Sequence, residues 1–278
     1  MLAVYAIVNG QEAGWGSFQT AGLLVLAVLL LAGFVLIEAR AKSPLVPLEL
    51  FRHRTLATAN GVAALLAAGM FSWFFLSALY LQRILGYSPL EVGLAFLPAT
   101  LLMGAFSLGL SARVVMRFGI RTPLVAGLAC LTLGLLLFAR APVDGDFVVD
   151  VLPSMILLAL GAGLAFNPLL LAAMGDVTPE QSGLASGLVN TTQMMGGAVG
   201  LAVLVSLAAT RTESLLDSGS SELAALNGGY HAAFVAGAGF ALVGLVLAAA
   251  LMQAKLPAMA GGHAGEATPD TGVAAEPE

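Results

Sequence analysis

The residues that could do chemistry inside the apolar stretches of this sequence are neutral and polar. They are Asn60, Ser72 and Ser77 in one stretch, Asn167 in another, and Asn190, Thr191, Thr192 and Gln193 in a third. In lipid, such groups either hydrogen-bond across helices, at about 0.6 kcal/mol each on average, or line a cavity. Both interpretations stay open. No Asp, Glu, Lys or Arg lies in the interior of a stretch, so no proton-carrying carboxylate is expected there.

The reactive side chains do not form a catalytic set. A hydrolase built on Ser186 would need an adjacent base, but His53 lies in a loop, His231 at the end of an apolar stretch and His263 in the tail. A retinal protein would need a lysine in the membrane interior, whereas both lysines flank apolar stretches. The single cysteine, Cys130, excludes a disulfide within the chain and a cysteine metal cluster. We therefore expect no enzyme activity, metal or cofactor.

The composition indicates a protein whose main solvent is lipid. Apolar residues make up 59% of the 278 residues and charged ones only 10%, with a mean hydropathy of +0.96. A soluble domain carries about 25% charged residues. The net charge of −5 gives no reason to expect a nucleic-acid partner.

Seven charge-free stretches are long enough to cross a bilayer, which takes roughly 20 apolar residues. They lie between Glu12 and Glu38, Arg54 and Arg83, Glu91 and Arg113, Arg121 and Arg140, Asp150 and Asp176, Glu180 and Arg211, and Glu222 and Lys255. We therefore predict an all-α membrane protein with seven transmembrane helices. Placing 40–54 in the cytoplasm puts eight Lys and Arg residues on that side and three on the other, as the positive-inside rule requires. The amino end is then outside.

The predicted organisation has five parts. Residues 1–19 form a helix stump and an outer loop, because Met1–Val8 is too short to cross. A transmembrane helix follows at 20–38, then a basic cytoplasmic linker at 39–55. Six further spans make up a bundle at 56–253. The tail, 254–278, is acidic and lacks aromatic residues, so we expect it to be disordered.

Glycine and proline suggest local features in two spans. Gly161, Gly163, Asn167 and Pro168 mark either a bend beside a cavity or a kink needed only for packing. In the sixth span, the pairs Gly183/Gly187 and Gly196/Gly200 have the four-residue spacing of close helix contacts. We interpret them, together with Asn190 and Gln193, as a surface for helix packing or an interface to a partner bundle.

A short basic turn joins the third and fourth spans. Gly119 suits a helix end that needs a positive φ, and Arg117 and Arg121 flank it as anchors for phosphate headgroups.

Several motifs together resemble one transporter family. They are Gly10-Gln11-Glu12-Ala13-Gly14-Trp15-Gly16, Pro44-Leu45-Val46-Pro47-Leu48 with Phe51-Arg52, Tyr80-Leu81-Gln82 with Leu85-Gly86-Tyr87-Ser88-Pro89, and Gly183-Leu184-Ala185-Ser186-Gly187 with Asn190-Thr191. In this order they resemble the fourteen-helix drug:proton antiporters of the major facilitator superfamily, the EmrB/QacA type.

The resemblance implies the carboxy-terminal portion of a multidrug or small-molecule efflux transporter in the cell membrane. The first span would be an extra linker helix, and the other six would form the carboxy-terminal bundle of the major facilitator fold. Partners would be the lipid bilayer, a small hydrophobic or cationic substrate and an amino-terminal bundle outside this sequence, without which the chain is inactive. The alternative is a non-transporting membrane subunit, or a truncated product that only packs against a partner.

The same resemblance implies where a substrate would lie. The second and fifth spans would face the central cavity, which makes Asn60, Trp73, Tyr80, Phe166 and Asn167 candidate lining residues. The basic turn would correspond to a cytoplasmic motif of the superfamily. Met116 stands where that motif has an acid, so only the anchoring role carries over.

Overall fold

The structure is a computed structural model and describes residues 2–13, 17–40, 54–175, 177–178 and 181–251. These residues form helices and no strand. Most of the predicted linker and all of the predicted tail lie outside the described residues.

Seven helical segments are long and apolar enough to cross a membrane, which confirms the predicted count. They are α2 (Phe18–Arg40), α3 (Arg54–Arg83), the continuous run Pro89–Phe118, α6 (Arg121–Phe138), Phe147–Met174, α8 (Ser182–Asp217) and α9 (Glu222–Leu251). Each begins and ends near the charges that bounded the apolar stretches, because a charge in mid-bilayer is costly. Glu38, the charge that was expected to end the first span, is buried in the last turn of α2, which continues to Arg40.

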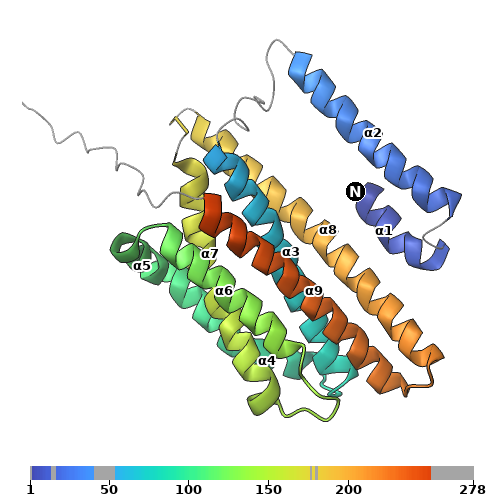
Figure 1. The fold of residues 1–278 in the computed structure, drawn as a ribbon. Coiled ribbons are helices and arrows are strands. Elements are labelled where there is room, and N and C mark those ends of the chain that lie inside the picture. Colours follow the sequence, from blue (N-terminus) through green and yellow to red (C-terminus); the bar gives the residue numbers. More distant parts are fainter. Residues whose placement is uncertain (1, 14–16, 41–53, 176, 179–180, 252–278) are drawn as a thin grey trace, which may run out of the picture.

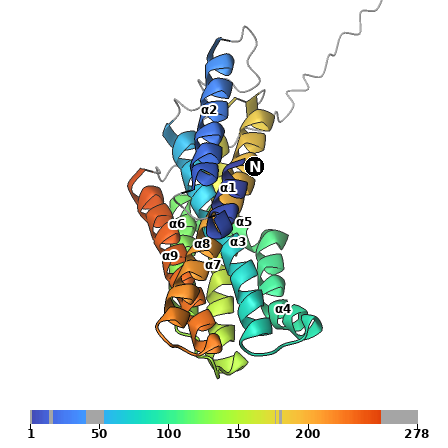
Figure 2. The same cartoon turned by 90° about the vertical axis from the view of Figure 1, so that its right-hand side faces the viewer.

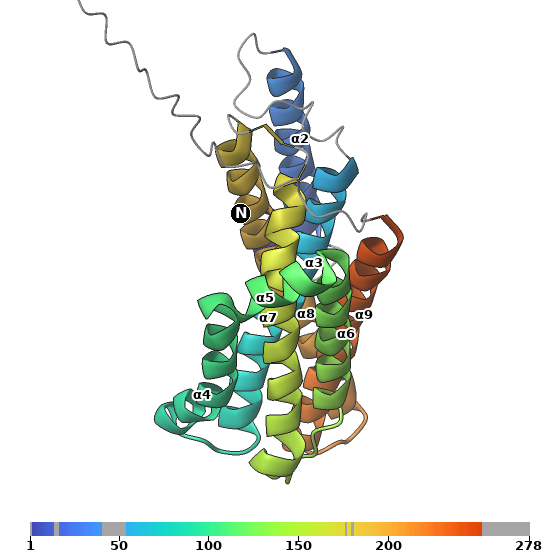
Figure 3. The same cartoon turned by 90° about the vertical axis from the view of Figure 1, so that its left-hand side faces the viewer.

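The bundle is built around α3, whose side chains are the most completely buried of the seven spans. α3 packs along α8 and α9 on one side and against α7 (Leu152–Met174) on another, while α6 packs along α7 and α9. α4 (Pro89–Ala105) rests mainly on α7 and lies on the flank opposite α9 (Figures 2 and 3).

Glycines bring α6 and α7 into close contact. A Cβ atom on Gly127 would lie 2.7 Å from the carbonyl oxygen of Gly161, and one on Gly161 would lie 2.7 Å from that of Gly127. Neither position has room for a side chain, so Gly161 serves packing between these two helices.

The amino-terminal helices are attached at one side. α1 (Leu2–Ala13) packs against both α2 and α8, and it lies between them (Figure 1). α2 contacts the bundle chiefly through α1, and most of its apolar side chains are exposed. α2 is therefore a separate element beside the other six spans.

The third span is broken, a feature that no sequence pattern had predicted. α4 is followed by one π-helical turn, η2 (Phe106–Leu110), and then by α5 (Ser111–Phe118). Gly109 within the turn has a φ of 114°, a conformation that L side chains rarely adopt. Ser111, two residues further on, is buried. Kinks in helices often occur at Gly/Ser pairs, and Gly109 with Ser111 is such a pair.

Side chains of α3 and α9 fix the loop between α6 and α7 at the Arg83 end of the bundle. The Tyr80 hydroxyl donates to the carbonyl oxygen of Pro142, at 2.6 Å. The Asn227 amide donates to the Ala141 carbonyl at 3.1 Å, and His231 Nε2 lies 2.8 Å from the same oxygen. The loop leads into a π-helical turn, η3 (Phe147–Val151), from which α7 continues.

Candidate functional site

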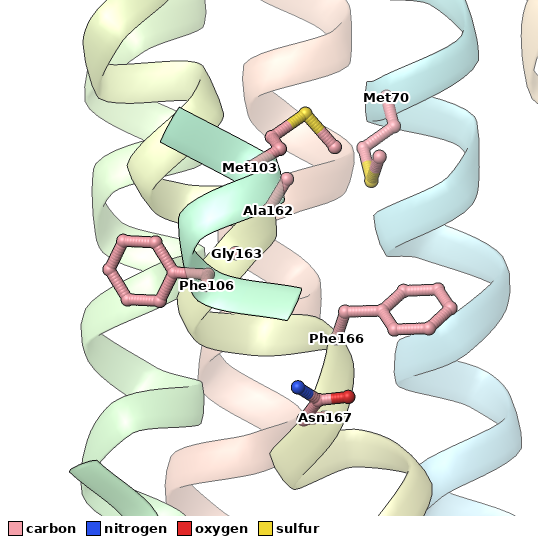
Figure 4. A pocket seen from close by; sticks show the side chains of 7 residues that line it. All are labelled: Met70, Met103, Phe106, Ala162, Gly163, Phe166 and Asn167. Carbon is pink, nitrogen blue, oxygen red and sulfur yellow. The ribbon is translucent and has the colours of Figure 1, made fainter. Parts of the chain in front are cut away.

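A cavity of about 210 Å³ lies between α3, the end of α4 and the middle of α7. Its walls are Met70, Met103, Phe106, Ala162, Gly163, Phe166 and Asn167 (Figure 4). The lining is mostly apolar, with two thioethers, two aromatic rings and one amide. This combination of an apolar surface and one orienting polar group is typical of small-molecule sites.

Phe166 lines the cavity, and its side chain is 47% exposed. The next residue, Asn167, is half-buried and presents its amide to the cavity. Met70 and Met103 approach each other from α3 and α4 at the opposite side (Figure 4). α7 continues as a helix through Pro168, which is itself buried. The cavity therefore lies beside an uninterrupted helix, and the break in this region belongs to the third span.

Gly163 determines how closely the third span approaches α7. A Cβ atom at Gly163 would lie 2.8 Å from Cγ of Phe106 and 2.9 Å from its Cβ. Phe106 is buried and is the first residue of the π-helical turn. The absence of a side chain at Gly163 thus lets the broken segment pack against the wall of the cavity.

Two of the five candidate lining residues, Phe166 and Asn167, lie together at this cavity. The other three lie elsewhere in the structure. Trp73 is 0% exposed, Tyr80 1% and Asn60 5%, so each is enclosed within this bundle and none lines the cavity.

Each of these three side chains makes its contacts within the bundle instead. Trp73 packs with Phe74 and Phe96, at ring-centroid distances of 4.3 and 6.2 Å. Tyr80 packs edge-on against Phe138 at 5.6 Å and holds the loop between α6 and α7. The Asn60 amide donates to the carbonyl of Leu56 one turn earlier, at 2.9 Å.

The residues that sequence reasoning missed are Met70, Met103, Phe106, Ala162 and, as a wall of the cavity, Gly163. None is polar, so nothing distinguished them from packing residues. The one available signal was that methionine is common at adaptable binding surfaces.

The two glycine pairs of α8 face different surroundings. A Cβ atom at Gly196 would lie 2.5 Å from the Cα of Ala64, and one at Gly200 would lie 2.2 Å from the Cβ of Ala68. Both therefore pack against α3, within this chain. Gly183 and Gly187 are exposed, and no described atom lies within 4 Å of where their Cβ atoms would be.

The same open side of α8 carries polar groups. Asn190 and Thr191 are exposed, and Gln193 is half-buried. Gly183, Gly187, Asn190 and Thr191 follow one another at spacings of four, three and one, which places them on one side of the helix. This outward stripe therefore lies apart from the Gly196/Gly200 contact with α3.

The basic turn has the geometry expected of a tight helix connection. Gly119 ends α5 with a φ of 76°, and its N–H donates to the carbonyl of Val115 at 2.8 Å. The Arg117 guanidinium carbon lies 5.4 Å from the centre of the Phe118 ring. Arg121 donates to the carbonyl of Ala249 near the end of α9, satisfying a carbonyl in its last turn.

Among the described residues, no group of three or more His, Cys, Asp and Glu could hold a metal ion. The cavity also lacks ionisable side chains. What the arrangement can do is bind a small apolar or weakly polar molecule.

These features define a multi-pass helical membrane protein with a small-molecule cavity between its spans. The sequence model of the major facilitator superfamily matches residues 2–201, so the chain belongs to that superfamily.

Curated relatives extend this comparison. The puromycin resistance protein pur8 of Streptomyces alboniger is 36% identical over 261 residues, which cover 92% of this chain and 52% of pur8. The cephamycin export protein CmcT of Amycolatopsis lactamdurans is 36% identical over 263 residues, covering 93% and 51%. The tetracenomycin C resistance and export protein of Streptomyces glaucescens is 34% identical over 214 residues, covering 75% and 38%. The chain thus spans about half the length of the first two.

Proposed function

We propose that this chain is the carboxy-terminal half of a proton-driven exporter of small hydrophobic or cationic molecules, of the EmrB/QacA type. The observation that carries the proposal is the cavity between α3, α4 and α7, with Phe166 and Asn167 in its lining. The names of the relatives, which include resistance and export proteins for several antibiotics, support the same class of function.

The lining suits a range of substrates rather than one. Met70 and Met103 are flexible and polarisable, so they can adapt to ligands of different shape. The exposed ring of Phe166 can attract a cation by about 0.5–1 kcal/mol. Asn167 offers both a donor and an acceptor.

The size of the cavity supports a role as one wall of a larger site. Its volume of about 210 Å³ is below the roughly 300–1,000 Å³ of drug-sized sites. A second bundle facing Phe166 would enlarge it. Alternating access in such transporters requires one bundle to rock against another.

The outward stripe of α8 supports the proposal of a second bundle. Exposing the amide of Asn190 and the hydroxyl of Thr191 to lipid is costly. Gly183 and Gly187 offer lipid little side-chain surface, but they would let another helix approach closely. We therefore assign this stripe to an interface with an amino-terminal bundle.

Proton coupling would depend on that second bundle, because the apolar interiors of these spans hold no Asp, Glu, Lys or Arg. The alternative of a non-transporting membrane subunit accounts equally well for the spans and the stripe, but it gives the cavity no use. Binding at the cavity therefore distinguishes the two functions.

A photoreactive hydrophobic cation tests this. In the purified full chain it should label α3, α4 and α7 around the cavity. Phe166→Ala should reduce labelling about threefold, from the loss of the cation–π contact. Leu242→Ala, at an exposed position on α9, should leave it unchanged. Labelling spread over lipid-facing helices, with equal yield in both variants, would contradict a binding role for the cavity.

A further inference from the structure

A second cavity lies near the Arg83 end of α3, between α3, α8 and the start of α9. Its volume is about 290 Å³. Its polar lining residues are Arg83, Thr212, Glu213 and Tyr230, and the deeper walls include Leu79 and Val205. The remaining lining residues are aliphatic. The transport proposal makes no use of this cavity.

The cavity has a polar rim and an apolar interior at different depths. Arg83 is the last residue of α3, and Glu213 lies one turn before α8 ends. Leu79 and Val205 precede these two charges by four and eight residues, or about 6 and 12 Å along a helix. The rim is therefore at the level where a span meets the headgroups, and the apolar walls extend toward the hydrocarbon.

The two charges at the rim are available to a ligand. Arg83 and Glu213 are both exposed, and within the described part of the chain neither forms an ion pair with the other or with a third residue. One positive and one negative side chain therefore lie at the rim of the same cavity.

One of the two hydroxyl groups is also available. Thr212 already donates to the carbonyl of Ala208, at 2.9 Å. The ring of Tyr230 is buried, but its hydroxyl makes no hydrogen bond to any described residue. A tyrosine whose ring is buried normally finds a partner for its O–H group.

We propose that this cavity binds the zwitterionic phosphoethanolamine headgroup of a membrane phospholipid. The phosphate accepts hydrogen bonds from the Arg83 guanidinium and the Tyr230 hydroxyl. The ammonium group donates to the Glu213 carboxylate, and an acyl chain follows Leu79 and Val205 toward the hydrocarbon. Arginine suits phosphate because its planar fork of N–H donors matches the phosphate oxygens.

The same chemistry discriminates between lipids. A choline headgroup has no N–H to donate to Glu213. A glycerol headgroup carries no positive charge, so nothing in the headgroup would offset the repulsion between the Glu213 carboxylate and the phosphate. Phosphatidylethanolamine satisfies both charges of the rim, and we expect it to bind about tenfold more tightly than phosphatidylcholine with the same acyl chains, because hydrogen bonds to charged groups are among the stronger ones.

Native mass spectrometry of the purified full chain can measure this preference. The chain is titrated separately with phosphatidylethanolamine, phosphatidylcholine and phosphatidylglycerol of identical acyl chains. Glu213→Gln should reduce the ethanolamine preference from about tenfold to about threefold, since a charge-assisted bond is roughly twice as strong as a neutral one. Glu222→Gln, an exposed acid at the same end of the bundle that does not line the cavity, should retain the preference.

Two further variants test the phosphate contact. Arg83→Gln should weaken phosphatidylethanolamine and phosphatidylglycerol alike, whereas Arg211→Gln, at a nearby exposed position outside the cavity, should weaken neither. Tyr230→Phe should weaken both lipids by a smaller factor.

Three results would overturn the proposal. Equal affinity for the three lipids would remove the discrimination on which it rests. An unchanged ethanolamine preference in Glu213→Gln would place the headgroup elsewhere. Complete competition by free phosphoethanolamine at the concentrations at which the lipid binds would show that the acyl chain contributes nothing, and would exclude a lipid as the ligand.

Discussion

Replacing Gly200 with alanine should separate α3 from α8. The added Cβ would lie 2.2 Å from the Cβ of Ala68, whereas carbon atoms in contact prefer about 3.5–4.0 Å. The two helices would have to move apart by roughly 1.5 Å, since the obstruction is a methyl group fixed to the backbone. Overpacking of this kind typically costs about 1–3 kcal/mol.

The neighbouring stripe supplies a matched control. Gly187→Ala makes the same chemical change on the same helix, but nothing lies within 4 Å of the new methyl group. Alanine is favoured over glycine in a helix by about 0.5–1 kcal/mol. That gain applies to both variants, so their difference isolates the contact with α3.

Thermal unfolding of both variants in one detergent measures the effect. We expect Gly200→Ala to lower the melting temperature by about 5 °C, taking about 2–4 °C per kcal/mol for a chain of this size. Gly187→Ala should melt at or slightly above the wild-type temperature. A Gly200→Ala chain as stable as wild type, with Gly187→Ala less stable, would refute the assignment of the two glycine pairs.

Two other predictions concern the break and the topology. Gly109→Ala should destabilise the chain by about 1–3 kcal/mol in thermal unfolding, because φ is 114° at that position. Gly104→Ala, in a regular helix with open space around it, should not destabilise the chain. Equal melting temperatures of the two variants would contradict a strained break. In a Cys130→Ala background, Ser221→Cys should react with an impermeant maleimide added to intact cells, whereas Phe118→Cys should react only after permeabilisation. The reverse pattern would mean that the chain has the opposite orientation in the membrane.

The spans could be predicted from the sequence because lipid imposes one simple rule. Charges such as Arg83 and Arg121 cannot lie in mid-bilayer, so they limit each helix. The break at Gly109 could not be found in this way, since a π-helical turn leaves the apolar composition unchanged. The Gly/Ser pair at this position is too common in membrane helices to predict a break by itself.

The candidate site was predicted only in part, and for a physical reason. Phe166 and Asn167 were named because the family resemblance places the fifth span at the central cavity, and Asn167 was also singled out by the proline that follows it. Trp73 and Tyr80 were assigned to the same cavity by family architecture, but whether a side chain on a central helix points inward depends on helix rotation. Rotation follows from close contacts such as Gly200 with Ala68, and these depend on which helices become neighbours.

Transport by reconstituted protein tests the central claim most directly. The chain is placed in proteoliposomes alone and together with the part of a relative, such as the puromycin resistance protein pur8, that this chain does not match, as the second bundle. Efflux of a fluorescent hydrophobic cation is followed. We predict efflux under a proton gradient, abolished by an uncoupler and reduced by Phe166→Ala, only when both bundles are present. Uncoupler-sensitive efflux by the chain alone, or none with both bundles folded and associated, would contradict the account.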